Sequence, residues 1–427
     1  MFDLKYQIPQ GVKDELPDYY STKENIINSV KEVFKSYGYR HISTPTIEYY
    51  DVFSSINSTL IKEDIFKFID SSGKILALRP DVTIPIARIV ANNYKEETDL
   101  KLFYISKVFR MNGDKDNLDK EFSQAGIEYF GDETRDADGE VIAVGIKALK
   151  KINSNFQVEI GNALFFKGLI DELNLDDKTI EKIRVLIENK NFVELKKFIK
   201  KLKIKSEVKK VLIELPKLYG NFIDVIKKAK TLCLNEKMKR ALIDLEKVYK
   251  RLLDYGYKEY ISADLGLINH LDYYTGIVFK GYINNHGRII LTGGRYDKLT
   301  KEYGKDLPAT GFALNIDELI KSIGGKKDMF KSKYKIDFSI LYKNKNRKNV
   351  FSIADKLRDQ GFIVETKPFK KSLKEYINYA DDKNVKKLLV YKDDILKLID
   401  IKKNMSTNIK TKDLFNFIRN SKVVSVH

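Results

Sequence analysis

The chain has 427 residues, of which 43% are hydrophobic and 32% are charged, a balance typical of a globular protein with two or three domains. A single cysteine, Cys233, excludes an intramolecular disulfide, and the four histidines lack metal-ligand spacing, so we expect no metal site. The chain contains no apolar run long enough to cross a bilayer and does not begin with a secretion signal, which predicts a cytoplasmic protein.

The net charge of +18 is concentrated near one end of the chain. Residues 331–427 contain 24 basic and 11 acidic side chains, so this segment carries +13 of the total. A basic segment of this kind can attract phosphate groups. Lysine is abundant throughout the chain, however, and a generally lysine-rich composition explains the excess more simply.

The first fifty residues predict a helix followed by an interrupted strand. Apolar residues recur at helical spacing between Ser21 and Tyr37, and Gly38 suits the left-handed cap that ends many helices. Residues 41–46 then have strand-forming side chains. Pro45 within them predicts an edge position or a break in the strand.

Residues 64–79 predict a β-hairpin that turns at Ser71-Ser72-Gly73. It places Asp81 and Thr83 just before a helical run that starts at Ile84. The two side chains can cap this helix or bind a ligand, and the residues alone leave both interpretations open.

Two further strands are predicted on either side of a polar loop from Asn112 to Lys120. Gln124, Gly126 and Glu128 lie two residues apart in the second strand and therefore share one face. Arg110 ends the first strand close to them. Burying such polar groups is costly unless they hold a polar ligand or one another, and we favour a ligand.

From Phe165 to Tyr260 the pattern is that of amphipathic helices, which predicts a helical insertion because strand patterns resume at Ile261. Residues 266–279, GLINHLDYYTGIVF, then place Asp272, Tyr273 and Tyr274 in a strand-like run. They predict either a hairpin with a buried tyrosine pair or the wall of a polar pocket.

The last third of the chain predicts a helix and a second domain. Residues 312–323, FALNIDELIKSI, have helical spacing and precede Gly324-Gly325. Strand and helix patterns then alternate as in a small α/β domain. We therefore predict a core over 1–325 with an insertion at about 165–260, a linker over 326–335 and a domain over 336–427.

Seven motifs in order resemble the class II histidyl-tRNA synthetase fold from about residue 8 to 325. The motifs are Gln10-Gly-Val-Lys-Asp14, LRPDVT (78–83), VFR (108–110), EFSQAGIE (121–128), LDYYTG (271–276), GGRYDKL (293–299) and GFALNIDEL (311–319). Residues 337–419 resemble the anticodon-binding domain of the same family. The resemblance implies an α+β fold with an antiparallel sheet flanked by helices, and a dimer built on the first helix-strand unit.

The resemblance also implies a histidine pocket. Its residues would be Asp81, Thr83, Arg110, Gln124, Glu128, Tyr273 and Tyr274. In such a pocket carboxylates receive the α-ammonium and the imidazole N–H of histidine, and the tyrosines pack on the ring.

Three departures from the synthetases fall at contacts with ATP or with the transition state. Asn269-His270 stands where the synthetases have Arg-Gly, and Glu318 replaces the arginine that clamps the γ-phosphate. The loop after Arg110 reads Met-Asn-Gly-Asp in place of x-Glu-Arg-Pro. Together these changes indicate that adenylation has been abandoned.

A synthetase-like chain that keeps the histidine site and loses the ATP site resembles the regulatory subunits of ATP phosphoribosyltransferase. The resemblance implies a non-catalytic protein without a cofactor that assembles with a short catalytic subunit. The complex would perform the first step of histidine biosynthesis under histidine feedback. Many members of that family do not carry the C-terminal domain in full, which is a departure here.

The sequence leaves two other functions open. A divergent histidyl-tRNA synthetase would need arginines at 269 and 318. A histidine or tRNA sensor would use the basic C-terminal domain, for which we otherwise expect at most weak nucleic-acid binding.

Overall fold

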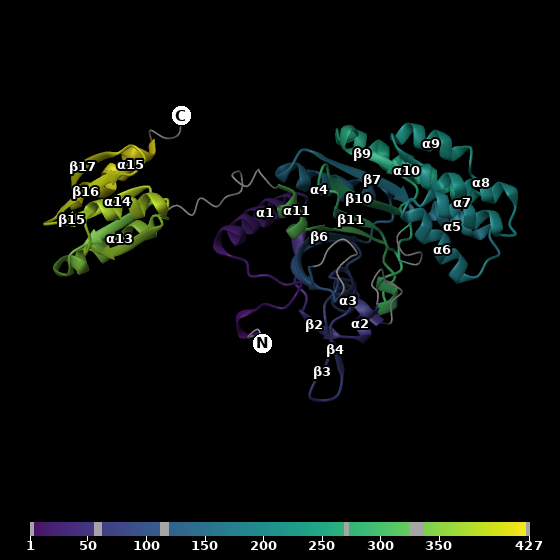
Figure 1. Ribbon diagram of the computed structural model, residues 1–427, viewed down its shortest axis with the longest axis horizontal. Coiled ribbons are helices and arrows are strands. Elements are labelled where there is room, and N and C mark those ends of the chain that lie inside the picture. The colour runs from purple at the N-terminus through teal and green to yellow at the C-terminus, as the bar shows by residue number, and fades with distance from the viewer. Residues whose placement is uncertain (1–3, 55–61, 112–118, 269–272, 324–335, 424–427) are drawn as a thin grey trace. The chain divides into compact units, whose positions relative to one another are not determined.

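The computed structural model describes residues 4–54, 62–111, 119–268, 273–323 and 336–423, with side chains described as far as residue 418. The chain divides into two compact units, Met1–Phe330 and Lys331–His427. The predicted linker over 326–335 lies outside the described residues. Figure 1 shows the elements of both units.

A nine-stranded sheet forms the centre of the first unit, in the order β1-β5-β6-β12-β11-β10-β7-β9-β8. Neighbouring strands are antiparallel except at the parallel pairs β1–β5 and β7–β9. The strands are β1 (Arg40–His41), β5 (Leu100–Phe109), β6 (Glu121–Phe130), β7 (Phe156–Asn162), β8 (Tyr219–Gly220), β9 (Ile261–Asp264), β10 (Ile277–Ile283), β11 (Ile289–Arg295) and β12 (Ala309–Asn315). The sheet is thus largely antiparallel, as the motifs predict.

Alternate residues of the long strands face two different apolar cores. In β5, Phe103 contributes to the core shared with the helices α1 (Pro17–Ser36), α4 (Arg135–Ile152) and α10 (Glu236–Asp254). Leu102 and Tyr104 point to the opposite face and pack with α3 (Thr83–Asn93). The period of two residues therefore assigns Gln124 and Glu128 of β6 to the face that α3 covers.

The N-terminal helix and hairpin form largely as predicted. Helix α1 starts at Pro17, and Gly38 follows it with a φ of 84°. A three-stranded sheet has the order β2-β4-β3, with β2 (Ile47–Tyr49), β3 (Lys67–Ile69) and β4 (Ile75–Leu78), and the short helix α2 (Asp51–Ser54) follows β2. Pro45 separates β1 from β2, so it breaks the predicted strand.

Helices fill most of the segment between β7 and β9. They are α5 (Ala163–Asp171), α6 (Asp177–Glu188), α7 (Phe192–Lys201), α8 (Ser206–Glu214), α9 (Phe222–Lys230) and α10. Their apolar faces join the core of the sheet, while most of their lysines lie outside. None of the helices in the described part of the chain is long and apolar enough to cross a bilayer.

The helix predicted over 312–323 is shorter than its pattern suggested. Residues 312–315 belong to β12, and only Ile316–Ile323 form a helix, α11. The prediction of a helix from residue 312 was wrong because Phe312 and Leu314 face the core beneath α1 and α4 in strand alternation, which short apolar runs do not distinguish from helical spacing.

The second unit is a five-stranded mixed sheet in the order β14-β13-β15-β16-β17. Its elements are β13 (Phe338–Tyr342), α13 (Arg347–Asp359), β14 (Val364–Pro368), α14 (Leu373–Asp382), β15 (Lys387–Lys392), β16 (Ile395–Asp400), β17 (Met405–Lys410) and α15 (Leu414–Val423). Separate apolar cores cover the two faces of this sheet, one with α13 and α15 and the other with α14. A C-terminal α/β domain was predicted, but its last two strands and last helix were not.

Candidate ligand-binding site

Glu128 is the centre of a buried polar site in the first unit. It lies near the end of β6, between β5 and β12, and only 1% of its surface is exposed. The hydroxyl of Thr83, the first residue of α3, donates to Glu128 Oε1 at 2.6 Å. The hydroxyl of Tyr296 donates to Glu128 Oε2. Both carboxylate oxygens therefore have a neutral donor, one from the first residue of α3 and one from the residue that follows β11 (Ile289–Arg295).

Glycines in the neighbouring strands make room for this carboxylate. Gly311 pairs with Glu128 across β12 and β6, and a Cβ at Gly311 would lie 2.0 Å from Glu128 Oε2. A Cβ at Gly126, two residues earlier in β6, would lie 2.6 Å from the hydroxyl oxygen of Tyr104. The sheet backbone thus forms the floor of the site. A larger residue at 126 or 311 would occupy the space that Tyr104 or Glu128 now takes.

Aromatic rings form one wall of the site. Tyr273 stacks on Tyr296, with ring centroids 5.6 Å apart, and meets Tyr274 edge to face at 4.9 Å. Tyr274 packs so closely on Gly294 that a Cβ there would lie 2.7 Å from its ring. Of the tyrosine pair that the sequence singled out, Tyr274 is therefore buried, and the partly buried Tyr273 stacks on a partner of Glu128.

Two buried polar atoms on the same face lack a partner. The hydroxyl oxygen of Tyr104 and Oε1 of Gln124 have no hydrogen bond among the residues that the structure describes. Tyr104 pairs with Gly126 across β5 and β6, and Gln124 lies four residues before Glu128 on the same strand face. Buried polar atoms are rarely left unpaired in proteins, so their position here favours a polar ligand.

Asp81 and Thr83 have different roles at the start of α3. Asp81 Oδ1 accepts the amide of Ile84 at 2.8 Å, so the capping interpretation is confirmed for Asp81. Thr83 instead directs its hydroxyl to Glu128. Arg110, beside them, donates from Nε to the carbonyl of Pro80 at 3.1 Å, and its guanidinium lies 5.4 Å from the centre of the Phe122 ring.

Burial raises the pKa of both carboxyls in the site. It raises the pKa of Glu128 to about 8, although the hydroxyls of Thr83 and Tyr296 oppose the shift. Burial also raises the pKa of Asp81, against the influence of the Ile84 amide and Arg110. At neutral pH Glu128 is therefore mostly protonated, and a ligand with a cationic or N–H group would favour its ionised form.

We expect Glu128 to make the stability of the protein depend on pH. The folded chain holds a proton on Glu128 up to about pH 8, whereas the unfolded chain loses it near the ordinary pKa of 4.5. The contribution of Glu128 to stability therefore falls as pH rises through this window. Between pH 5 and pH 8 the free energy of unfolding should fall by about 1–3 kcal/mol more in the wild type than in Glu128→Gln.

Urea unfolding of both proteins at several pH values measures this difference. The variant serves as the control because all other titrating groups remain. Equal slopes for the two proteins, or a wild type that gains stability relative to the variant, would contradict a raised pKa at Glu128.

The structure brings all seven predicted residues to one region of the sheet. Thr83 contacts Glu128 directly, and Gln124 lies on the same strand face as Glu128. Burial and nearby charges link Asp81, Arg110 and Tyr273 electrostatically to the same cluster. Tyr274 contacts Tyr273. Asp272, Asn269 and His270, which the sequence also singled out, lie outside the described residues.

Tyr104 and Tyr296 belong to this site and were not predicted. Tyr296 lies in the motif GGRYDKL, but its contact with Glu128 spans 168 positions and has no local signal. Tyr104 could have been found by pairing the two predicted strands, because it lies opposite Gly126.

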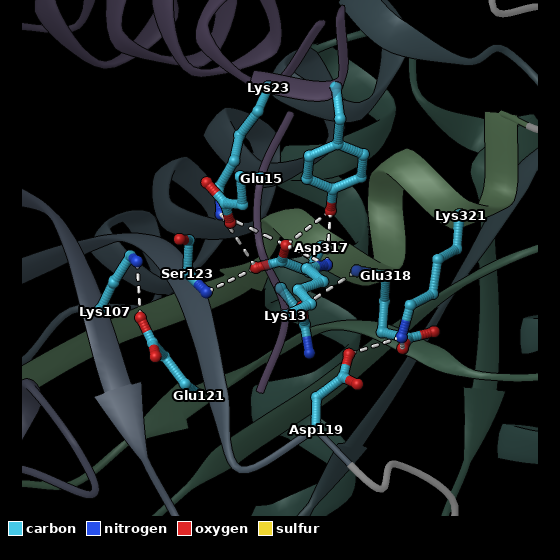
Figure 2. A network of polar contacts seen from close by, with 12 residues as sticks. Lys13, Glu15, Lys23, Lys107, Asp119, Glu121, Ser123, Asp317, Glu318 and Lys321 are labelled. Carbon is cyan, nitrogen blue, oxygen red and sulfur yellow. Dashed lines mark hydrogen bonds and ion pairs between the residues drawn. The ribbon is translucent and has the colours of Figure 1, made fainter. Parts of the chain in front are cut away.

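A second polar cluster lies at the start of α11, where Asp317 and Glu318 are adjacent and buried (Figure 2). Asp317 accepts the amide of Ser123 at 2.7 Å and the hydroxyl of Tyr19 at 2.7 Å. Its other partners are Lys13 at 2.9 Å and Lys23 at 3.2 Å. Burial acts to raise the pKa of Asp317, but Lys23 and the hydrogen bonds lower it to about 2.

Residues 11–319 match the family model described as Histidyl-tRNA synthetase. A protein from Acetivibrio thermocellus named ATP phosphoribosyltransferase regulatory subunit is 37% identical over 396 residues, covering 92% of this chain and 94% of that protein. A protein of the same name from Clostridium kluyveri is 41% identical over 394 residues, covering 91% of this chain and 100% of that protein. The chain belongs to the family of ATP phosphoribosyltransferase regulatory subunits.

Solved structures agree with this family. A crystal structure from Bacillus halodurans, described as an ATP phosphoribosyltransferase regulatory subunit/histidyl-tRNA synthetase, is 34% identical, with a TM-score of 0.79 over 90% of this chain and 98% of that chain. A histidyl-tRNA synthetase from Nostoc has a TM-score of 0.79 at 21% identity, over 97% of this chain and 99% of that chain, and shows the fold alone. The class II synthetase-like fold predicted from the motifs is confirmed.

Family membership confirms the predicted regulatory subunit and favours it over a divergent synthetase. The match also bears on the C-terminal domain, which was expected to be a departure. The first unit contains only residues 1–330, so a match over 92% of the chain extends into the second unit. These relatives therefore share much of that domain with this chain.

Proposed function

We propose that this protein is the non-catalytic regulatory subunit of an ATP phosphoribosyltransferase and responds to histidine bound at the Glu128 site. The observation that carries the proposal is an enclosed polar site with unpaired buried atoms in a chain of this family. Its partner would be a short catalytic subunit, and the complex would perform the first step of histidine biosynthesis in the cytoplasm. A protein without chemistry of its own acts by coupling its ligand site to a partner.

The chemistry of the site suits histidine. Glu128 can receive an imidazole N–H or a cationic ring, and Asp81 can pair with the α-ammonium group. The stacked rings of Tyr273 and Tyr296 suit a flat aromatic ligand. Gln124 and Tyr104 supply buried polar atoms that find no partner in the described part of the chain.

The proposal predicts a three-part response in an activity assay. The short catalytic subunit should form phosphoribosyl-ATP slowly alone, faster with this protein, and slowly again when histidine is added. If histidine favours an inhibited complex, formation of that complex must tighten histidine binding by the same factor. If the activity of the catalytic subunit is the same alone, with this protein, and with this protein plus histidine, the proposal is contradicted.

A matched variant separates the two halves of this function. Glu128→Ala should still activate the catalytic subunit, because Glu128 lies inside the site and not on the surface. Inhibition by histidine should be lost in this variant. If the variant loses both the activation of the catalytic subunit and the inhibition by histidine, Glu128 acts in assembly of the complex and not in ligand binding.

The proposal includes a homodimer formed through the N-terminal helix-strand unit, in which α1 and β1 would meet their copies. Sedimentation of the isolated protein tests this assembly. A monomer at micromolar concentration would contradict it.

For the second unit we propose only weak binding to nucleic acid. A cavity of about 320 Å³ in it is lined by Lys367, Lys370, Lys371, Tyr376 and Tyr379, among others. With a net charge of +13 over residues 331–427, binding to RNA should fall steeply with salt, because release of counterions dominates such contacts.

Electrophoretic mobility of several tRNAs with the protein at about 50 and 200 mM salt tests this prediction. Lys370→Ala with Lys371→Ala should weaken binding equally for all of them. A salt-resistant preference for one tRNA would instead support the histidine or tRNA sensor.

A further inference from the structure

Glu318, in the first turn of α11, is a buried carboxylate held by three basic side chains. His286 Nε2 lies 2.9 Å from Oε2, Arg288 Nη1 lies 3.0 Å from Oε1, and Lys321 Nζ lies 2.8 Å from Oε1. Lys321 also pairs with Asp119 at 2.6 Å, as Figure 2 shows. Two of the basic groups come from the connection between β10 and β11, and the third comes from α11 itself.

The carboxylate and its partners differ in exposure. The side chain of Glu318 is 2% exposed, whereas those of Arg288 and Lys321 are 38% and 37% exposed and that of His286 is 15% exposed. The basic groups therefore reach solvent, and Glu318 lies beneath them as their shared anion. An anion from solution could contact the same groups if Glu318 were absent.

The adjacent carboxylate provides a useful contrast. Asp317 is satisfied partly by the amide of Ser123 and the hydroxyl of Tyr19, and its partner Lys23 is itself buried. Those contacts join segments of the fold to one another. The partners of Glu318 that contact its carboxylate oxygens are basic side chains, a set that matches the donors used for phosphate oxygens.

We infer that Glu318 is an internal anion that occupies an oxyanion site formed by His286, Arg288 and Lys321 and keeps it closed to phosphate-bearing ligands. A carboxylate tethered at this position competes with any free anion at an effectively high concentration. Its charge also repels an approaching polyphosphate. This inference does not depend on the ligand proposed for the Glu128 site.

Binding of inorganic tripolyphosphate, measured by calorimetry at low salt, tests the inference on the full-length protein. Glu318→Ala should bind tripolyphosphate at least about tenfold more tightly than the wild type, because Arg288 and Lys321 lose the carboxylate that they share. Glu318→Gln, which keeps the shape of the side chain, should show a smaller gain in the same direction. Adding Arg288→Ala to Glu318→Ala should remove the gain.

Asp119→Asn is the matched control, because it removes the other partner of Lys321 and leaves Glu318 in place. It should bind tripolyphosphate as weakly as the wild type does. Circular dichroism and urea unfolding of each variant report that the fold is intact. The inference is overturned if neither Glu318 variant binds tripolyphosphate more tightly than the wild type, or if the gain persists without Arg288.

Discussion

Replacing Glu128 with alanine is expected to weaken histidine binding by about 2–5 kcal/mol, the cost of leaving a buried charged or N–H group of the ligand without its partner. In the wild type the carboxylate lies over Gly311, where no side chain separates it from the strand. Truncation therefore leaves a hole that no neighbouring side chain of β12 can fill. Calorimetric titration of wild type and variant with histidine measures the difference.

Glu121→Ala is the matched control for this experiment. It makes the same truncation on the same strand, but Glu121 pairs with Lys107 and lies outside the Glu128 site. Its affinity for histidine should equal that of the wild type. If Glu128→Ala also binds with unchanged affinity, histidine binds elsewhere in the molecule.

Histidine-dependent exchange of pyrophosphate into ATP should remain at background with this protein. Loss of one preorganised charged contact commonly lowers a rate by about 10²–10³. Here Glu318 stands where the resemblance to the synthetases implies a cation, and its contacts with Arg288 and Lys321 hold it there. Exchange measured beside an active histidyl-tRNA synthetase decides the matter, and turnover comparable to that enzyme would contradict the loss of adenylation.

A single reversion should not restore exchange. Glu318→Arg would place a third positive group beside Arg288 and Lys321, which disfavours the folded arrangement. Asn269 and the loop after Met111 would still differ from the synthetases. Restoration by this change alone would show that residue 318 was the only obstacle.

Local patterns in the sequence account for much of the fold. Helical spacing located α1, the turn at Gly73 located the β3–β4 hairpin, and alternation along β6 placed Gln124 and Glu128 on one face. Each of these signals depends on neighbours within a few residues. Residues 312–315 show the limit, because a run of three apolar residues and an asparagine fits a strand end and a helix start equally well.

The parts of the site that were not predicted depend on contacts between distant segments. Tyr296 reaches Glu128 only because β11 lies two strands from β6 in the sheet order. The raised pKa of Glu128 likewise results from the burial that the assembled sheet provides. Composition and spacing carry no information on such pairs, whereas the seven ordered motifs predicted a set of pocket residues through resemblance.

The contacts of Asp317 can form only late in the synthesis of this protein. Lys13 and Asp317 are 304 positions apart, so the segment before α1 gains this ion pair only when most of the first unit has been translated. At about 5–20 residues per second, roughly 15–60 s separate the two ends of this ion pair on the ribosome. During that interval α4 and Phe103 of β5 can already pack on α1, whereas the part of α1 that α11 covers in the finished protein stays open. A nascent chain that stalls before residue 317 would therefore expose only that part of α1 to chaperones and proteases.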